Sequence, residues 1–585
     1  MPVKPIYHKS PLSSLHALPL GPGQVRTDRA VLRLIYQQMH AYSDRPEMWE
    51  GLFLLACFFS QDPIHEPVVQ HVMTGLQAQK PDGAFPGTIS NALQLARTAL
   101  AVYEYGNDRT VLKSVTAWCG WILVNWEDVI GQDEIQKQPA DLMDFLEKVY
   151  RYTGKQAILS LCDRLRMESL NWTSILRTFS LKRPMSQIAS WLETRAGMDR
   201  EMENSQSLPT EEDGIDRRQF SHIQGVYTRQ YLTSHVETLA GGMHASLLNG
   251  LYSCRHDEQH APQDGWQKIH RFHGVPAGGT TGDEVLEGSN PSCGMDTAGI
   301  SAWVQALAAQ LVMEDSSWAA EALDRIVHNS LPSCVHNKTL IHFQRVNQLE
   351  KDCSTRDLYH VHQMPSQKQR SLSRMARAWA AAYSSAVMTT KDGCEVQMYL
   401  DGDYSLALNG EACRVRFAVS KAEAGMTWQM RASVRASVAL RLYSWMGQPE
   451  ILVNGEALAA ERTGDFLQIQ REWEPGDHLV LRWTNLLRTE ECYHQGMCVM
   501  YGHDLMSLDT DARRRWAVGV VGEPEKQDGQ VVIHVRSVPE WSQNGGVPSQ
   551  LPVRPRGEGE VFPVVLTPYS ETLPRLSVFP RCADS

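Results

Sequence analysis

Apolar residues between about residues 30 and 390 recur every three or four positions and are interrupted by short polar turns. They keep this spacing over 93–103, stop at the turn Gly106-Asn107-Asp108, and resume it over 111–118. Such spacing is typical of amphipathic helices. The same unit of helix, turn and helix recurs at 142–165 and at 303–326. Serial helical hairpins without intervening strands predict a solenoid or a closed (α/α)6-type helical toroid.

Beyond about Cys394 the apolar period changes to two, which is typical of half-buried strands. The alternating segments are EVQMYL, YSLAL, CRVRFAVS, VALRLYSW, EILVNGEAL, FLQIQREW and HLVLRW. Short strands separated by Gly, Asp, Pro and Asn turns predict an antiparallel β-sandwich. The pattern continues through RWAVGVVG and QVVIHVRSV, and the Pro-rich stretch after residue 546 predicts an irregular tail.

These changes of pattern divide the chain into three predicted parts. A catalytic toroid is expected over 1–390, a β-sandwich over 391–500, and further strands with a Pro-rich C-terminal tail over 501–585. Two polar stretches, 201–219 and 256–265, predict loops inserted into the helical part. A chain of 585 residues exceeds what one hydrophobic core normally supports, so a multidomain protein is expected.

Charge and hydropathy narrow the range of partners. The net charge is −11, and no Lys/Arg-rich patch is present, which argues against nucleic acid or an anionic membrane as the main partner. Apolar runs such as 51–59 are too short to span a bilayer, and the N-terminal segment lacks a signal-peptide pattern, so a cytoplasmic protein is expected. The charge therefore favours a small molecule or a glycan as the target, and a homodimer stays open.

The twelve cysteines are scattered and form no CxxC pair. Most lie inside helix-like or strand-like apolar runs, where a free thiol behaves as a small buried hydrophobe. The pattern therefore predicts reduced, structural cysteines and not disulfides or metal ligands.

The segment GGTTGDEVLEGSNPSCGMDTAG, residues 278–299, places four carboxylates in a run rich in Gly, Ser, Thr and Pro. This composition predicts a loop, and a long loop in a compact protein is usually either disordered or functional. Two interpretations stay open for the four acids. They form a solvated loop, in which Asp296 caps the helix that follows, or they belong to a catalytic site. The four are Asp283, Glu284, Glu287 and Asp296.

One family shares several of these features. The segment PEILVNGEALAAERTGDFLQIQREWEPGDHLVLRW, residues 449–483, resembles the sandwich signature of the β-L-arabinofuranosidase family, glycoside hydrolase family 127 (GH127) and its relatives. Helical landmarks follow in the family's order, and the resemblance covers about residues 50–510. The landmarks are LQAQKPDGAFPG (76–87), DLMDFLEKVYRYTGKQAIL (141–159), HVET (235–238), 266–279 and WAAEALDRIVHN (318–329).

The resemblance implies roles for the acidic loop and a departure from the family's mechanism. The family's general acid/base glutamate is matched by Glu284. Its zinc-binding Glu and Cys are matched by Asp296 and Ala298, so the carboxylate is kept and the thiol is lost. Its Cys-Cys pair, which includes the nucleophile, should lie in 359–383, where Arg374 matches the following arginine and no cysteine occurs. The resemblance therefore implies a divergent member without zinc–cysteine chemistry, and we expect no metal and no other cofactor.

Two carboxylates are the minimal equipment for glycoside hydrolysis. We predict Glu284 as the general acid, because the apolar neighbours Val285 and Leu286 favour its protonated form. Asp296 is the predicted nucleophile or base, and the remaining two acids of the loop are the reserves.

The predicted substrate-binding residues are partly implied by the family and partly by residue type. The resemblance places His235 and His270 or His273 where imidazoles contact the sugar, although each is about equally well read as a structural histidine. Trp266 is a candidate sugar-stacking ring, but most tryptophans of a toroid are core residues. His360 and His362 share a strand face but lack an identifiable third metal ligand. The predicted set is His235, His270, His273, Arg374, Asp283 and Trp266.

The sequence thus favours a glycoside hydrolase that removes a terminal pentose or deoxy sugar from an oligosaccharide or glycoside. One alternative is a polysaccharide lyase or another enzyme acting on uronates, in which Arg345 or Arg374 would neutralise the substrate carboxylate. Another is a non-catalytic homologue that binds glycans after losing its nucleophile.

Overall fold

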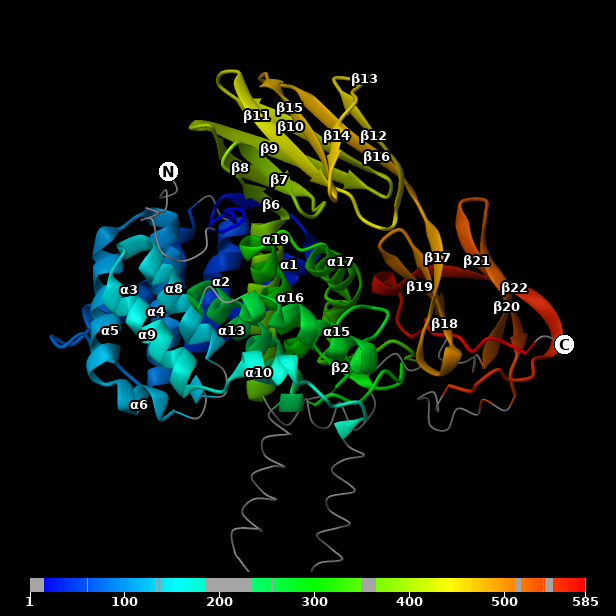
Figure 1. Ribbon diagram of the computed structural model, residues 1–585, viewed down its shortest axis with the longest axis horizontal. Helices are drawn as coiled ribbons and strands as arrows, with labels where there is room; N and C mark the ends of the chain where they lie inside the picture. Colours follow the sequence, from blue (N-terminus) through cyan, green and yellow to red (C-terminus); the bar gives the residue numbers. More distant parts are fainter. Residues whose placement is uncertain are drawn as a thin grey trace, which may run out of the picture.

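The computed structural model describes residues 15–583 apart from 60–61, 133–134, 137–138, 186–232, 254–255, 283–284, 349–364, 511–516, 540 and 542–550. A helical domain, blue to green in Figure 1, has a β-sandwich on one side, in yellow, and a second β-domain next to both, in orange and red. This order of helical toroid and β-domains confirms the predicted fold class. The predicted insertion 201–219 lies outside the described residues. No described helix is both long and apolar enough to cross a membrane.

The helical domain is built around an inner ring in which each helix packs against the next and the last returns to the first. The ring consists of α2 (Pro46–Phe59), α4 (Ile89–Gly106), α8 (Ala140–Thr153), α13 (Val236–Ser253), α16 (Thr297–Met313) and α19 (Pro365–Ala386). Helices that contact the ring from outside include α1 (Ala30–His40), α3 (Pro67–Gln77), α5 (Arg109–Val124), α9 (Gln156–Glu168), α15 (Ala261–His273) and α17 (Ser317–Arg325). Helix α16 is buried along nearly its whole length, as expected of a helix that is apolar on all sides.

Local sequence explains the hairpins. Asn107 ends α4 in the left-handed conformation (φ 58°), and Asp108 caps α5 by accepting a hydrogen bond of 2.8 Å from the backbone N–H of Thr110. Gly154 plays the same terminating role between α8 and α9 (φ 64°). The predicted hairpins are confirmed because these turn residues are local signals.

Two loop predictions fail. Residues 256–265 were expected to form a loop, but α14 (His256–Gln259) and the start of α15 occupy them. Pro262 lies in the first turn of α15, where proline is tolerated because no helical partner is needed for its missing N–H. Within 278–299, the short strand β2 (Gly294–Asp296) and the first residues of α16 interrupt the predicted loop.

Two sheets form the sandwich. One has the order β1-β8-β9-β10-β16-β12-β13 and the other β14-β15-β11-β7-β6. Trp428 of β10 and Trp473 of β15 meet between them with ring centroids 4.9 Å apart, and both are buried. Among the described pairs of the sandwich, β7 and β11 run parallel and the others antiparallel. The bounds are β1 (Val25–Arg26), β6 (Val387–Thr389), β7 (Gly393–Val396), β8 (Gly402–Leu408), β9 (Glu411–Ser420), β10 (Glu423–Met430), β11 (Val434–Arg441), β12 (Met446–Val453), β13 (Glu456–Ala457), β14 (Glu461–Thr463), β15 (Phe466–Trp473) and β16 (His478–Asn485).

The second β-domain corrects the prediction of an irregular tail. Strand β22 (Glu558–Pro568) lies inside the sheet between β19 and β21, and its prolines do not prevent pairing. The segment VFPVVL carries the β-branched residues that strands favour, and the Pro-rich flank obscured this signal. The other strands are β17 (Leu487–Glu491), β18 (Met497–Tyr501), β19 (Asp504–Asp509), β20 (Val518–Gln527), β21 (Gln530–Ser537) and β23 (Arg575–Leu576).

Ionic and polar contacts join the toroid to the second β-domain. Arg325 of α17 donates two hydrogen bonds to Glu490 of β17, at 2.8 and 2.5 Å. The Asn329 side chain donates to the backbone oxygen of His503 (2.9 Å) and accepts from the N–H of Leu505 (2.7 Å). These bonds fix the position of the β-domain against α17.

A stacked histidine pair at this contact predicts acid sensitivity. The rings of His328 and His503 lie 3.9 Å apart, and burial lowers their pKa values to about 3 and about 4. Since unfolding restores an ordinary pKa near 6.5, the unfolded chain binds more protons, and stability is lost as the pH falls from about 6.5 towards 4. Asp324, whose pKa burial raises to about 6, acts in the opposite sense.

We therefore expect the free energy of unfolding to fall less steeply between pH 6.5 and 4 in His503→Phe than in the wild type. Urea denaturation at several pH values measures this slope. His534→Phe replaces a partly exposed histidine of β21 outside the stacked pair and is the control for this type of substitution. Equal slopes for the wild type and His503→Phe would contradict the prediction.

Candidate functional site

Charged side chains from several helices of the inner ring contact one another. We call the end of the ring at which α8, α13 and α16 begin its N-terminal end. Asp141, in the first turn of α8, forms three ion pairs through its carboxylate. The N···O distances are 2.7 Å to Arg97 of α4, and 2.8 Å to Arg377 and 3.4 Å to Arg374 of α19. Burial alone would raise the pKa of Asp141, but the three guanidiniums outweigh it and hold this pKa well below its usual range. Asp141 is therefore ionised and fully engaged.

The network extends in both directions from Asp141. Arg97 and Arg377 also contact Glu50 of α2, at 3.2 and 3.3 Å. On the other side, Arg374 Nε donates to Glu237 Oε1 of α13 at 2.7 Å. We call Glu237, Arg374, Asp141, Arg377, Arg97 and Glu50 the buried charge ladder. It connects α13, α19, α8, α4 and α2, so it spans most of the inner ring.

Asp296 lies at the junction of β2 and α16. Strand β2 pairs with β5 (Phe343–Arg345), and the Asp296 N–H donates to the backbone oxygen of Gly282 at 3.0 Å. Its carboxylate caps α16 by accepting from the N–H groups of Ala298 (3.2 Å) and Gly299 (3.1 Å). The capping interpretation offered by the sequence is thus confirmed, and it does not exclude a chemical role.

The electrostatics of Asp296 differ from those of an ordinary cap. Burial, followed by the negative charge of Glu237, raises the pKa of Asp296 to about 7, although the two capping bonds favour the ionised form. Glu237 has the opposite behaviour: burial would raise its pKa, but Arg374 and Arg370 lower it. Two neighbouring carboxyl groups with pKa values displaced in opposite directions are a typical acid–base arrangement.

The acidic loop is tied to the start of α13. His235 and Val285 form a β-bridge, and the N–H of Leu286 donates to the backbone oxygen of Ser234 at 2.9 Å. His235 Nδ1 lies 3.2 Å from the Thr238 hydroxyl. The structure therefore brings His235 and Arg374 to the same end of the ring as Asp296. Asp283 and Glu284 lie outside the described residues.

The other predicted substrate ligands have structural partners. His273 is fully buried; its Nδ1 accepts from the N–H of Gly288, and its Nε2 donates to the backbone oxygen of Leu181, each at 3.0 Å. Both ring nitrogens of His273 thus bond to backbone groups, and one of these groups belongs to the acidic loop, residues 278–299. Trp266 packs edge-on against Trp303 at 5.1 Å, and His270 stacks on Trp266 at 5.3 Å.

Burial lowers the pKa of His270 to about 4. Among the described residues, Trp266 and His270 contact neighbouring aromatic side chains and His273 contacts backbone groups, and these partners do not belong to the charge ladder. Their predicted substrate contacts stay predictions, as does the role of Glu287, which is half-buried in the acidic loop. Arg345 belongs to β5, and His360 and His362 lie outside the described residues. Among the residues that are described, no group of three or more His, Cys, Asp or Glu side chains is placed to hold a metal ion.

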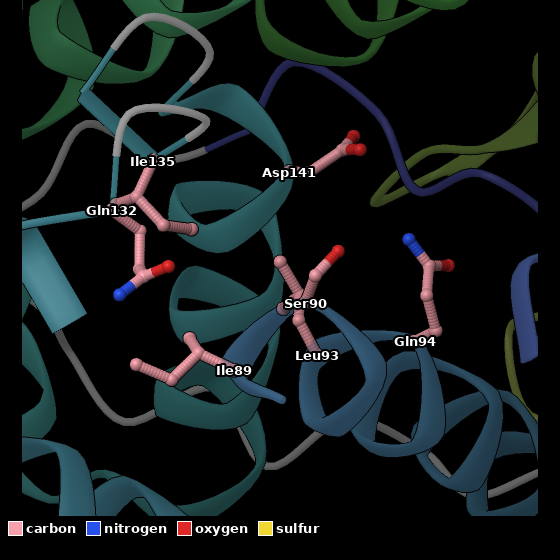
Figure 2. Close-up of a pocket in the computed structure, with 7 residues that line it drawn as sticks. All are labelled: Ile89, Ser90, Leu93, Gln94, Gln132, Ile135 and Asp141. Carbon is pink, nitrogen blue, oxygen red and sulfur yellow. The ribbon is translucent and has the colours of Figure 1, made fainter. Parts of the chain in front are cut away.

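A small hollow opens at the same end of the ring, between α4 and α8 (Figure 2). Apolar side chains and neutral polar groups share its wall, and the Asp141 carboxylate is the charged group among the described residues that line it. The lining residues are Ile89, Ser90, Leu93, Gln94, Gln132, Ile135 and Asp141. Amide and hydroxyl groups next to apolar side chains suit an uncharged polyhydroxyl ligand.

Sequence reasoning quoted HVET and DLMDFLEKVY as landmarks but missed the roles of Glu237 and Asp141. A usable signal was present in α4, where Arg97 follows Leu93 by four positions on the buried face of the helix. A charged residue on an apolar face is rarely buried without a partner. Such a residue therefore indicates an ion pair with another helix, although it does not say which one.

Comparisons with known proteins agree with this architecture. Residues 383–484 match the family model of the β-L-arabinofuranosidase GH127 middle domain. This segment includes the sandwich signature on which the sequence resemblance rested, so the resemblance is confirmed. No curated protein sequence matches the chain.

Solved structures match nearly the whole chain. A GH127 β-L-arabinofuranosidase from Geobacillus stearothermophilus T6 is 16% identical with a TM-score of 0.63, and the match covers 94% of this chain and 92% of that one. A protein described as a glycoside hydrolase gives a TM-score of 0.69 at 12% identity, and a GH127 β-arabinofuranosidase gives 0.62 at 12% identity; both matches cover 97% of this chain and 98% of the other. At these identities the likeness establishes a shared fold.

Proposed function

We propose that this chain, which contains a GH127 middle domain and has the fold of GH127 enzymes, is a glycoside hydrolase that releases a terminal sugar by carboxylate chemistry. The observation that carries the proposal is Asp296, whose pKa burial and Glu237 raise to about 7 at the N-terminal end of the ring. A carboxyl group that is half protonated near neutral pH suits proton transfer to a glycosidic oxygen.

We propose a different division of roles from the one predicted, because burial and the charge of Glu237 raise the pKa of Asp296. Asp296 in its protonated form donates its proton to the leaving oxygen while the bond from that oxygen to the anomeric carbon breaks. Glu284 then becomes the base that activates water or the nucleophile that attacks the anomeric carbon. The two carboxyl groups exchange the roles that the sequence suggested, because burial acts on Asp296.

The substrate we propose is an uncharged sugar, an arabinofuranoside or another pentose or deoxy sugar at the end of an oligosaccharide or glycoside. The related structures described as β-arabinofuranosidases suggest the furanoside.

The uronate-acting alternative is not favoured. Arg374, one of the two arginines that could neutralise a substrate carboxylate, already pairs with Glu237 and Asp141. The solved structures with the same fold are described as glycoside hydrolases.

Hydrolysis of a panel of aryl furanosides, pyranosides and uronides tests the proposal. We expect turnover of a neutral pentoside or deoxyglycoside that survives EDTA, and a loss of about 10²–10⁴-fold in Glu284→Gln. Glu287→Gln, in the same loop, is the matched control. A loss in Glu287→Gln with none in Glu284→Gln would move the assignment to Glu287. Turnover of uronides alone would favour the uronate enzyme, and sugar binding without turnover a glycan-binding protein.

A further inference from the structure

Two arginines hold the buried carboxylate of Glu237 at the start of α13. Its side chain is 2% exposed, and both carboxylate oxygens are engaged: Oε1 with Arg374 at 2.7 Å and Oε2 with Arg370. Both arginines come from α19, so two successive turns of one helix hold this carboxylate at the start of α13. A buried carboxylate between two guanidiniums is ionised, and its direction is fixed.

Close packing of α13 and α16 brings Glu237 towards Asp296. Val236, the residue before Glu237, lies against Gly299 so closely that a Cβ added to Gly299 would be 2.6 Å from Val236 Cγ1. The backbone N–H of Gly299 also donates a hydrogen bond to the Asp296 carboxylate. A Cβ on Gly282, which bonds to the Asp296 backbone, would lie 2.8 Å from Val236 Cγ2. Two glycines thus let the first turn of α13 approach the cap of α16.

We propose that Glu237 is a positioning residue for Asp296: held by Arg370 and Arg374, it presents a fixed negative charge that keeps the Asp296 carboxyl protonated until the substrate's oxygen takes the proton. This inference rests on the proposed glycosidase function. Glu237 is 2% exposed and Asp296 is half-buried, so water screens the interaction between the two carboxylates less than it would at an open surface. The arginines modulate it, because each neutralises part of the charge of Glu237.

The proposal predicts shifts in opposite directions. Glu237→Gln removes the negative charge, so Asp296 should lose its proton at a pH about 1 unit lower or more. Arg370→Gln leaves Glu237 less neutralised and also removes a positive charge that lowers the pKa of Asp296 directly, so Asp296 should keep its proton to higher pH. Arg370 is half-exposed, its side chain being 48% accessible, so Arg370→Gln should fold. An unmoved midpoint in this variant counts against the proposal, whereas an upward shift supports it only together with the downward shift in Glu237→Gln.

Carbodiimide reacts with protonated carboxyl groups, so its pH-dependent labelling of Asp296, read by peptide mass spectrometry, measures the midpoint without an activity assay. Glu147→Gln is the control, since Glu147 is a buried partner of Arg151 elsewhere in the toroid and should leave the midpoint unchanged. The kcat/KM profile of the active variants should move with the labelling midpoint.

The outcomes separate this inference from the proposed function. Midpoints that move down in Glu237→Gln and up in Arg370→Gln support the charge effect, and matching shifts in kcat/KM extend it to catalysis. A midpoint that stays unmoved in a folded Glu237→Gln or in Arg370→Gln overturns it. Shifted midpoints in a protein that cleaves no glycoside would reject the hydrolase proposal while retaining the electrostatic coupling.

Discussion

Asp296→Asn is expected to lower kcat/KM for a cleavable glycoside by about 10²–10⁴-fold, the usual contribution of a general acid or base. The N–H groups of Ala298 and Gly299 donate to different oxygens of Asp296, and asparagine keeps one of these two oxygens. Since asparagine caps helices about as well as aspartate, stability should change little. Above pH 7 it should even rise slightly, because the folded protein then no longer carries an ionised Asp296 in a site that raises its pKa.

The pH dependence of the wild type assigns the role of Asp296. If Asp296 donates the proton, kcat/KM falls as the pH rises through about 7, the pKa that burial and Glu237 produce. A rise through the same pH would make Asp296 the base or nucleophile. Asp108→Asn, the same change at the cap of α5, is the matched control for loss of a capping carboxylate. Wild-type activity in Asp296→Asn would exclude both roles.

Much of the fold was predictable because its signals are local. The turn at Asn107, the cap at Asp108 and the period-two strands after Cys394 each depend on a few consecutive residues. The closed order of the inner ring is different, since it depends on contacts between helices far apart in the chain. Periodicity therefore left both a solenoid and a closed toroid open.

The site was predictable only in part for the same reason. The acidic loop and its similarity to a family motif pointed to Asp296, and the structure places His235 and Arg374 at the same end of the ring. The function of Glu237 depends on Arg370 and Arg374, which lie more than 130 positions away, and on the packing of Val236 against Gly299. No spacing along the chain encodes these contacts.

The charge ladder also holds helices of the ring together, and Asp141 contacts three of its arginines. Three guanidiniums from two helices converge on its carboxylate, and Arg97 and Arg377 are each only 7% exposed. Without the negative charge of Asp141, Glu50 would be the remaining carboxylate in contact with Arg97 and Arg377. Buried charges that lose a partner are costly because water cannot replace it.

Asp141→Asn should therefore lower the free energy of unfolding by about 3–5 kcal/mol, the usual effect of breaking a buried ion pair. The pKa of Asp141 is depressed in the folded protein, so its contribution is present above the ordinary aspartate pKa near 4 and is lost at lower pH. Urea denaturation followed by helical circular dichroism at pH 7 and at pH 3.5 should show the difference between variant and wild type shrink in acid.

An exposed ion pair gives the comparison that isolates burial. Asp163 of α9 lies 3.9 Å from Arg166, and its side chain is 58% accessible, so Asp163→Asn should change stability by less than about 1 kcal/mol. If Asp141→Asn costs no more than Asp163→Asn, the ladder does not stabilise the ring. If it costs several times more, the same residues that hold Glu237 next to Asp296 also hold the helices together, and variation of Arg374 will change stability and chemistry at once.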